Sequence, residues 1–198
     1  MNSSVATRDW LEDPTTALAD VAVPLYALAT VGLWFLARPY GPVRWKLASA
    51  SALVAAGVAL LANQAISHLW ERPRPFTAHA ALTHVLGART TDPSFPSDHA
   101  AAAFAIAFAV FAFSRRAGAI FLAVATLIGL SRIALGMHYP TDVLAGLLVG
   151  LASAALVTRA GIPWVSRIVA LVSRVTDPLL RPVWGGVRRV ASSLRVFP

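Results

Sequence analysis

The sequence predicts an all-α fold: a polytopic membrane helical bundle of about five transmembrane helices followed by an amphipathic C-terminal segment. Of the 198 residues, 57% are hydrophobic and 13% are charged. The mean hydropathy of +0.65 lies outside the balance that soluble domains keep. Uncharged stretches recur, each near or slightly under the roughly 20 residues that a spanning helix needs. The chain after residue 158 is instead rich in arginine.

Five uncharged stretches are the predicted spans. They cover residues 21–37, 47–70, 100–114, 117–131 and 143–158. Arginine side chains at their ends can reach the interface and make up missing length. One such stretch could be a buried helix of a soluble protein, but five in one chain favour a membrane protein. The acidic N-terminus lacks the basic region of a signal peptide.

The placement of lysine and arginine predicts the orientation. Basic residues follow the first, third and fifth spans, at Arg38, Arg44, Lys46, Arg115, Arg116 and from Arg159 onward. Because basic loops favour the cytoplasmic side, these segments are expected in the cytoplasm, together with the C-terminus. The N-terminus, the loop 71–96 and the turn 136–141 then lie outside, in a multi-pass protein of the plasma membrane.

The loop 71–96 begins with Glu71-Arg72-Pro73-Arg74-Pro75-Phe76. Its prolines keep the backbone extended and end the second span, so Arg74 is expected near the membrane surface. By itself an arginine–proline pair is more often a helix stop than an anion site.

A second motif, Phe95-Pro96-Ser97-Asp98-His99, opens the third span. Ser97 is the predicted N-cap, and His99 lies in the first turn. The free N–H groups and the positive dipole end of a helix N-terminus form a ready anion site. An ordinary capped helix with an interfacial histidine explains this motif equally well.

The third motif is more specific. It places Ser131, Arg132, His138 and Asp142 between the fourth and fifth spans. Gly136 permits a tight turn and Thr141 is the expected N-cap, so His138 and Asp142 should meet at the membrane edge. A carboxylate that accepts one imidazole N–H leaves the other nitrogen free as a nucleophile. A structural salt link is the alternative, but three motifs on one side of the membrane favour phosphoryl transfer.

Together the motifs resemble the type 2 phosphatidic acid phosphatase family. Its signature is Lys-(six)-Arg-Pro, then Pro-Ser-Gly-His, then Ser-Arg-(five)-His-(three)-Asp. The third motif matches in full, and the resemblance covers roughly residues 45–158. The first matches at Arg74-Pro75 with Ser67 at the lysine position, and the second has Asp98 at the glycine position.

The resemblance implies a membrane lipid phosphatase that acts through a phosphohistidine. The expected phosphate-binding residues are Arg74, Arg132, Ser97 and Arg72. His138 is the expected nucleophile, Asp142 orients it, and His99 protonates the leaving oxygen. His68 or Arg72 is expected to replace the absent lysine. The family implies no metal and no other cofactor, and His79 and His84 are expected on the loop surface.

Within the family, the second motif together with the segments 72–76 and 89–100 resembles the bacitracin-resistance type of undecaprenyl pyrophosphate phosphatase. The resemblance implies removal of the terminal phosphate from this lipid carrier of cell-wall synthesis. Phosphatidylglycerophosphate, phosphatidate and an isoprenyl monophosphate remain open as substrates.

Other classes fit the sequence less well. A transporter carries ionisable groups in mid-span, where only Asp20, near a helix end, is a candidate. A purely structural membrane protein leaves the motifs unexplained. Vanadate-dependent haloperoxidases share the oxyanion-binding residues, but their chains are soluble.

Residues 1–158 are predicted to form the transmembrane phosphatase domain, and residues 159–198 a basic amphipathic cytoplasmic tail. Arginine recurs in the tail at every seventh position, at Arg167, Arg174, Arg181, Arg188 and Arg195. Pro178, Pro182 and Gly185-Gly186 exclude one continuous coiled coil, which favours a segment bound to anionic lipid over a disordered tail. Despite its net charge of +8, the protein is not expected to bind nucleic acid, since the arginines adjoin apolar runs.

Overall fold

The computed structural model describes residues 12–37, 43–79 and 91–193. Its elements are α1 (Glu12–Leu36), α2 (Arg44–Leu69), α3 (Pro75–Ala78), α4 (Asp98–Phe113), α5 (Arg115–Ala134), α6 (Pro140–Arg159) and α7 (Ile162–Ser193). All seven elements of the described ranges are helices, which confirms the predicted all-α fold.

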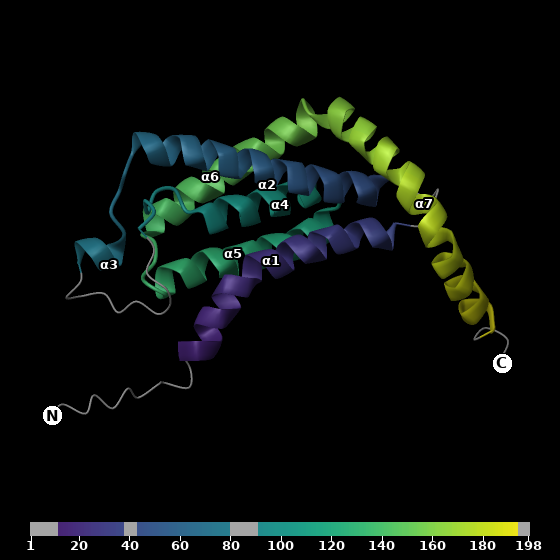
Figure 1. Cartoon of the computed structure of the whole chain (residues 1–198), viewed down its shortest axis with the longest axis horizontal. Helices are drawn as coiled ribbons and strands as arrows, with labels where there is room; N and C mark the ends of the chain where they lie inside the picture. The colour runs from purple at the N-terminus through teal and green to yellow at the C-terminus, as the bar shows by residue number, and fades with distance from the viewer. Residues whose placement is uncertain (1–11, 38–42, 80–90, 194–198) are drawn as a thin grey trace.

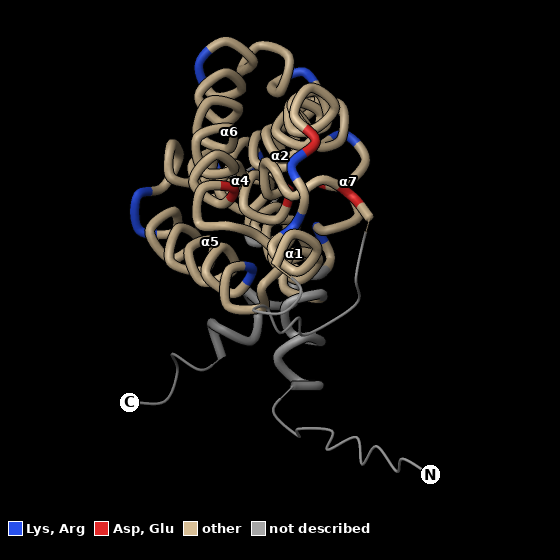
Figure 2. Tube along the Cα trace, turned by 90° about the vertical axis from the view of Figure 1, so that its left-hand side faces the viewer, with Lys and Arg blue, Asp and Glu red and all other residues tan. Residues whose placement is uncertain are grey.

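Five of these helices form one bundle, and α7 leaves it at the end opposite α3 (Figure 1). Viewed along the bundle, α4 lies between α2, α5 and α6 (Figure 2). The buried side chains of α4 are mostly alanine. Because alanine is small, the backbones of the surrounding helices can approach this central helix closely.

Three of the predicted spans have the length and composition of membrane-crossing helices: α2 with 26 residues, and α5 and α6 with 20 each. The other two are shorter apolar helices, 21–35 within α1 and the 16 residues of α4. Since neighbouring helices surround α4, its length does not have to match the hydrocarbon thickness. The protein is therefore an integral membrane helical bundle.

Two glycines allow α6 to contact the backbone of α4. A Cβ atom on Gly146 would lie 2.7 Å from the carbonyl oxygen of Ser97, and one on Gly150 would lie 2.7 Å from that of Ala101. These distances are too short for any side chain, so both positions require glycine. The contact holds the start of α4 against the start of α6, where the Ser97 N–H donates to the carbonyl of Asp142 at 3.1 Å.

A buried ion pair fastens α7 to the other end of the bundle. Lys46 was expected in a basic loop, but it lies in the first turn of α2, where it is 4% exposed. Its ammonium pairs with Asp177 and donates to Oγ of Ser173 at 3.1 Å. Trp34 of α1 adds a hydrogen bond of 3.3 Å to Oγ1 of Thr176.

The C-terminal segment is a single helix, and Pro178 and Pro182 lie inside it. These prolines were expected to exclude one continuous coiled coil, and a single helix does not contradict that expectation. A proline removes one backbone hydrogen bond and bends a helix, but the bundle holds α7 directly before the first proline through Asp177. The predicted amphipathic C-terminal segment is confirmed.

Candidate active site

A cavity of about 470 Å³ opens at the end of the bundle near α3. Four segments line it: the last turns of α2, the residues that follow α2, the start of α4 with the residues before it, and the turn between α5 and α6. The lining residues are Gln64, Ser67, His68, Glu71, Arg74, Asp92, Pro93, Pro96, Asp98, His99, Arg132, Met137 and His138. All three sequence motifs therefore contribute to one cavity.

His138 lies in the cavity wall and is 4% exposed. Its Nδ1 lies 2.8 Å from the carbonyl oxygen of Ser94, and its Nε2 lies 3.3 Å from Nη1 of Arg74. A carbonyl can only accept a hydrogen bond, and a guanidinium can only donate one. The two contacts therefore assign the proton to Nδ1 and a lone pair to Nε2.

Asp142 is fully buried in the first turn of α6. Oδ1 accepts from Nη1 of Arg72 at 2.8 Å, while Oδ2 accepts from Oγ of Ser94 at 2.5 Å and from the N–H of Tyr139 at 2.9 Å. Oδ2 lies 3.8 Å from Nδ1 of His138. The prediction that His138 and Asp142 meet is confirmed.

The sequence predicted a direct hydrogen bond from the His138 imidazole to Asp142. That prediction was wrong, because the two groups are 3.8 Å apart. The carbonyl of Ser94 takes the place of Asp142 as the acceptor. The physical reason is that other donors already occupy the carboxylate of Asp142. At 3.8 Å the carboxylate still acts on the imidazole through its charge.

Arg74 is held beside Nε2 of His138. Its Nε donates to the carbonyl of Asp92 at 2.9 Å, and its Nη1 donates to that of Met137 at 3.2 Å. Burial lowers the pKa of Arg74, and the negative charges of Asp92, Asp98 and Asp142 oppose this effect. An arginine remains protonated under such a shift, so the cavity keeps a cation next to His138.

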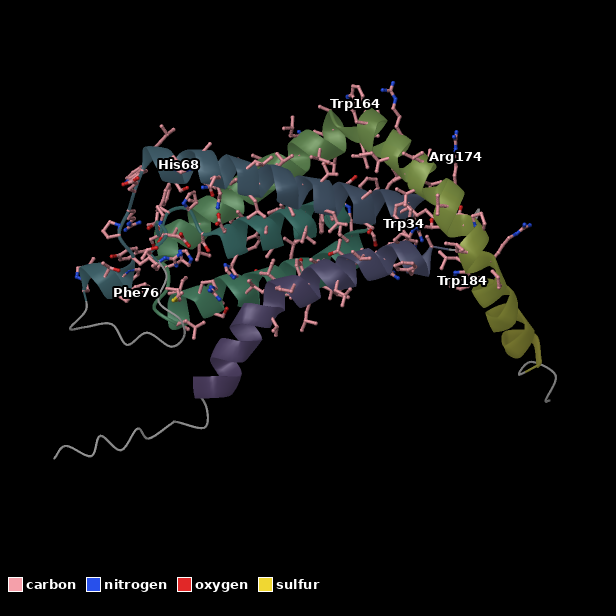
Figure 3. All side chains as sticks on the ribbon, in the orientation of Figure 1. Trp34, His68, Phe76, Trp164, Arg174 and Trp184 are labelled. Carbon is pink, nitrogen blue, oxygen red and sulfur yellow. The ribbon has the colours of Figure 1, made fainter. Side chains whose placement is uncertain are left out.

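Packing around α3 keeps the Arg74 segment close to the turn that carries His138. Phe76 forms a small buried cluster with Leu135 and Met137 at this end of the molecule (Figure 3). Arg132 lies in the last turn of α5, just before the turn that carries His138. It is 4% exposed and lines the cavity. Its carbonyl accepts the N–H groups of Met137 and His138 at 3.1 and 3.2 Å.

The start of α4 matches its prediction in part. Ser97 is the N-cap, since its side chain accepts the N–H of Ala100 at 3.5 Å. It is fully buried and is not among the cavity-lining residues, so its hydroxyl caps the helix. His99 and Asp98 line the cavity, and Asp98 accepts a hydrogen bond of 2.9 Å from Asn63.

Arg72 has a different position from the one expected. Besides Asp142, its Nη1 contacts Oγ1 of Thr141 at 2.7 Å, and its guanidinium lies 3.9 Å from the ring centre of Tyr139. It does not line the cavity, whereas His68 does. Of the two candidates for the absent lysine, His68 is therefore the one that reaches the cavity.

The turn between α5 and α6 corrects one further expectation. Gly136 has a φ of 68°, which confirms the tight turn. Thr141 is not the N-cap, because α6 starts at Pro140 and Tyr139 occupies the N-cap position. Proline suits the first helical position, and the carboxylate of Asp142 accepts the Tyr139 N–H as a cap.

Sequence reasoning missed two groups of this site. Ser94 and Gln64 were assigned no role, although Ser94 lies in the segment 89–100 and directly precedes the second motif. Within the described ranges, no three histidine or acidic side chains gather to hold a metal ion. His79 is exposed, as expected for a loop surface, and His84 lies outside the described residues.

The fold and the site together define a helical membrane protein in which two arginines and three histidines line one cavity. Residues 48–165 match the family model of the PAP2 superfamily. The chain belongs to this superfamily, and it is a phosphatase of the membrane.

Three known proteins show how widely the similarity extends. Undecaprenyl-diphosphatase BcrC of Bacillus subtilis (strain 168) is 30% identical over 167 residues, with 83% of each chain covered. The crystal structure of Aquifex aeolicus LpxE superposes with a TM-score of 0.56 at 25% identity, covering 76% of this chain and 87% of that one. The first transmembrane PAP2 type phosphatidylglycerolphosphate phosphatase of Bacillus subtilis gives a TM-score of 0.52 at 26% identity, covering 77% of each chain.

Proposed function

We propose that this protein hydrolyses an isoprenyl pyrophosphate, namely undecaprenyl pyrophosphate, to the monophosphate and phosphate through a phosphohistidine at His138. The observation that carries the proposal is the pair of contacts on the His138 ring. They keep the proton on Nδ1 and leave the Nε2 lone pair beside Arg74. A nucleophilic nitrogen next to a cation that can bind phosphate is the arrangement that phosphoryl transfer needs.

Two steps complete the reaction. In the first, a bond forms between Nε2 of His138 and the terminal phosphorus, while the bond from that phosphorus to the bridging oxygen breaks. His99 supplies a proton to the departing oxygen. In the second, water attacks the phosphorus, the nitrogen–phosphorus bond breaks, and inorganic phosphate leaves.

The phosphoryl oxygens are held by Arg74, Arg132 and backbone N–H groups at the start of α4. Both arginines line the cavity, and charge-assisted hydrogen bonds from guanidinium groups are strong. Ser97 contributes by capping α4. Arg72 acts on Asp142, whose charge stabilises the imidazolium that forms when His138 is phosphorylated.

Similarity to the undecaprenyl-diphosphatase BcrC supports a lipid pyrophosphate as the substrate. His68 and Gln64 form the α2 wall of the cavity, where they can meet the second phosphate. Phosphatidylglycerophosphate is the second candidate, favoured by the structural similarity to the phosphatase of Bacillus subtilis. Phosphatidate and an isoprenyl monophosphate also present a phosphate at the interface.

The sidedness belongs to the same proposal, with the cavity outside and α7 in the cytoplasm. Arg115, Arg116 and Arg159 lie at the ends of α5 and α6 remote from the cavity, and such basic segments favour the cytoplasmic side. Residues 1–158 then form the phosphatase domain and residues 159–198 a cytoplasmic tail.

An exposed apolar face of α7 supports contact between this tail and the membrane. The face consists of Trp164, Ile168, Leu171, Val175 and Leu179. Exposed arginines follow its edge at Arg167, Arg174 and Arg181. Trp164 and Arg174 point away from the bundle (Figure 3). The apolar face fits the interface, and the arginines fit anionic headgroups.

Phosphate release from purified protein tests the substrate. The four substrates to compare are undecaprenyl pyrophosphate, undecaprenyl monophosphate, phosphatidylglycerophosphate and phosphatidate. We expect kcat/KM for the pyrophosphate to exceed that for phosphatidate by at least about tenfold, which is about 1.4 kcal/mol of transition-state stabilisation. Expression should also raise bacitracin tolerance, because bacitracin sequesters this lipid. If phosphatidylglycerophosphate is the best substrate and tolerance is unchanged, carrier recycling is the wrong function.

A further inference from the structure

We infer that Ser94 is a positioning residue that sets the geometry between His138 and Asp142. The inference rests on the proposed function, since it concerns the nucleophile of that reaction. Ser94 is fully buried and lies in the segment between α3 and α4, two residues before Pro96. It does not line the cavity, so it acts on the reaction through other groups.

All three polar groups of Ser94 are engaged. Its N–H donates to the carbonyl of Arg72 at 2.8 Å, which ties it to the segment that follows α2. Its hydroxyl donates to Oδ2 of Asp142 at 2.5 Å. Its carbonyl accepts Nδ1–H of His138 at 2.8 Å. One residue therefore binds both the nucleophile and the carboxylate.

The hydroxyl of Ser94 holds the carboxylate of Asp142 in position relative to His138. The carboxylate has three donors: Ser94 and Tyr139 on Oδ2, and Arg72 on Oδ1. Tyr139 and Asp142 both lie at the start of α6. Ser94 is 48 positions away from Asp142 along the chain. Ser94 binds Asp142 through its hydroxyl and His138 through its carbonyl. Without the hydroxyl, Oδ2 of Asp142 loses this link to the residue that binds His138.

The imidazole gains a positive charge when Nε2 is phosphorylated, and the negative charge at 3.8 Å stabilises it. Displacing the carboxylate weakens that stabilisation during the chemical step. The substrate phosphate is bound by the cavity-lining arginines Arg74 and Arg132, whereas the hydroxyl of Ser94 contacts Asp142. Loss of the hydroxyl should therefore lower kcat and leave KM nearly constant.

Ser94→Ala isolates the hydroxyl, because the backbone contacts to His138 and Arg72 remain. We expect kcat to fall by about tenfold to a hundredfold, the range for losing a group that orients a reacting residue. KM and the inhibition constant of inorganic phosphate should change less than about twofold. Ser51→Ala is the matched control: Ser51 is also fully buried, and its hydroxyl has no hydrogen-bond partner. Its kcat should equal that of the wild type.

Ser94→Cys provides a second variant of similar volume. A thiol is a weak donor, so kcat should remain well below the wild type although the buried space is filled. A cysteine variant with full activity would show that filling the space is the whole role of Ser94, and this would overturn the inference.

A double-mutant cycle separates positioning from a general structural effect. If Ser94 acts through Asp142, adding Ser94→Ala to Asp142→Ala should lower kcat by less than about twofold further. Equal factors of loss in both backgrounds would overturn the inference. Failure of the proposed function looks different, because the wild type would then release no phosphate or His138→Ala would remain active.

Discussion

Arg72 donates a hydrogen bond of 2.8 Å from Nη1 to Oδ1 of Asp142, across 70 positions of the chain. The same guanidinium lies 3.9 Å from the ring centre of Tyr139. The arginine thus binds the carboxylate from one side while Ser94 binds it from the other. Arg72, which was expected to bind phosphate, therefore contacts Asp142 and does not line the cavity.

This position predicts that Arg72→Ala lowers kcat about tenfold to a hundredfold, by the same factor for an isoprenyl pyrophosphate and its monophosphate. His68→Ala should behave differently, raising KM for the pyrophosphate more than for the monophosphate, because His68 lines the cavity. Steady-state kinetics on both substrates measures this. If Arg72→Ala loses activity on the pyrophosphate alone, Arg72 binds phosphate as the sequence predicted.

The role of His99 depends on the leaving group. A monophosphate ester expels a poorly stabilised alkoxide, whereas a pyrophosphate expels a phosphate and p-nitrophenyl phosphate expels a stable phenolate. His99→Ala should therefore slow the monophosphate by about 10² to 10³ and the other two by less than about tenfold. Turnover of the three substrates by one preparation measures the difference. Equal losses would exclude His99 as the general acid.

The contact between α4 and α6 links packing to activity. Gly146→Ala places a methyl group against the backbone of Ser97, so α4 must move from the site. We expect destabilisation by about 1–3 kcal/mol together with reduced turnover. Gly57→Ala on α2 is the control, since a Cβ atom there has no neighbour within 4 Å. Thermal unfolding in detergent and phosphate release measure both effects, and equal behaviour of the two variants would contradict the account.

The sidedness can be measured with single cysteines, because the chain contains none of its own. Thr77 of α3 and Ala160 after α6 are exposed at opposite ends of the molecule. An impermeant thiol reagent applied to intact cells should label Thr77→Cys and leave Ala160→Cys unlabelled until the membrane is opened. The reverse pattern would place the cavity in the cytoplasm.

Sequence alone predicted the helical bundle, because long uncharged stretches leave few alternatives. It also predicted that Arg74, His99, Arg132 and His138 share one end of the molecule, since each adjoins the end of a span. The N-cap at Ser97 and the turn at Gly136 followed from local rules that need no tertiary information.

Contacts between distant segments were beyond the sequence. Nothing in the chain indicates that Arg72 contacts Asp142, or that the carbonyl of Ser94 replaces Asp142 as the acceptor for His138. Each depends on how the residues before α4 pack between α2 and α6. Lys46 was likewise counted as a loop charge, because the sequence does not show that it pairs with Asp177, 131 positions away.

Direct detection of the phosphoenzyme tests the central claim. Undecaprenyl pyrophosphate carrying ³²P in its terminal phosphate is mixed with the purified protein and quenched during turnover. We expect a labelled protein whose phosphate is stable in base and lost in acid, as for a phosphohistidine, and neither label nor turnover in His138→Ala. Labelling or turnover in His138→Ala within about tenfold of the wild type would contradict nucleophilic attack by His138.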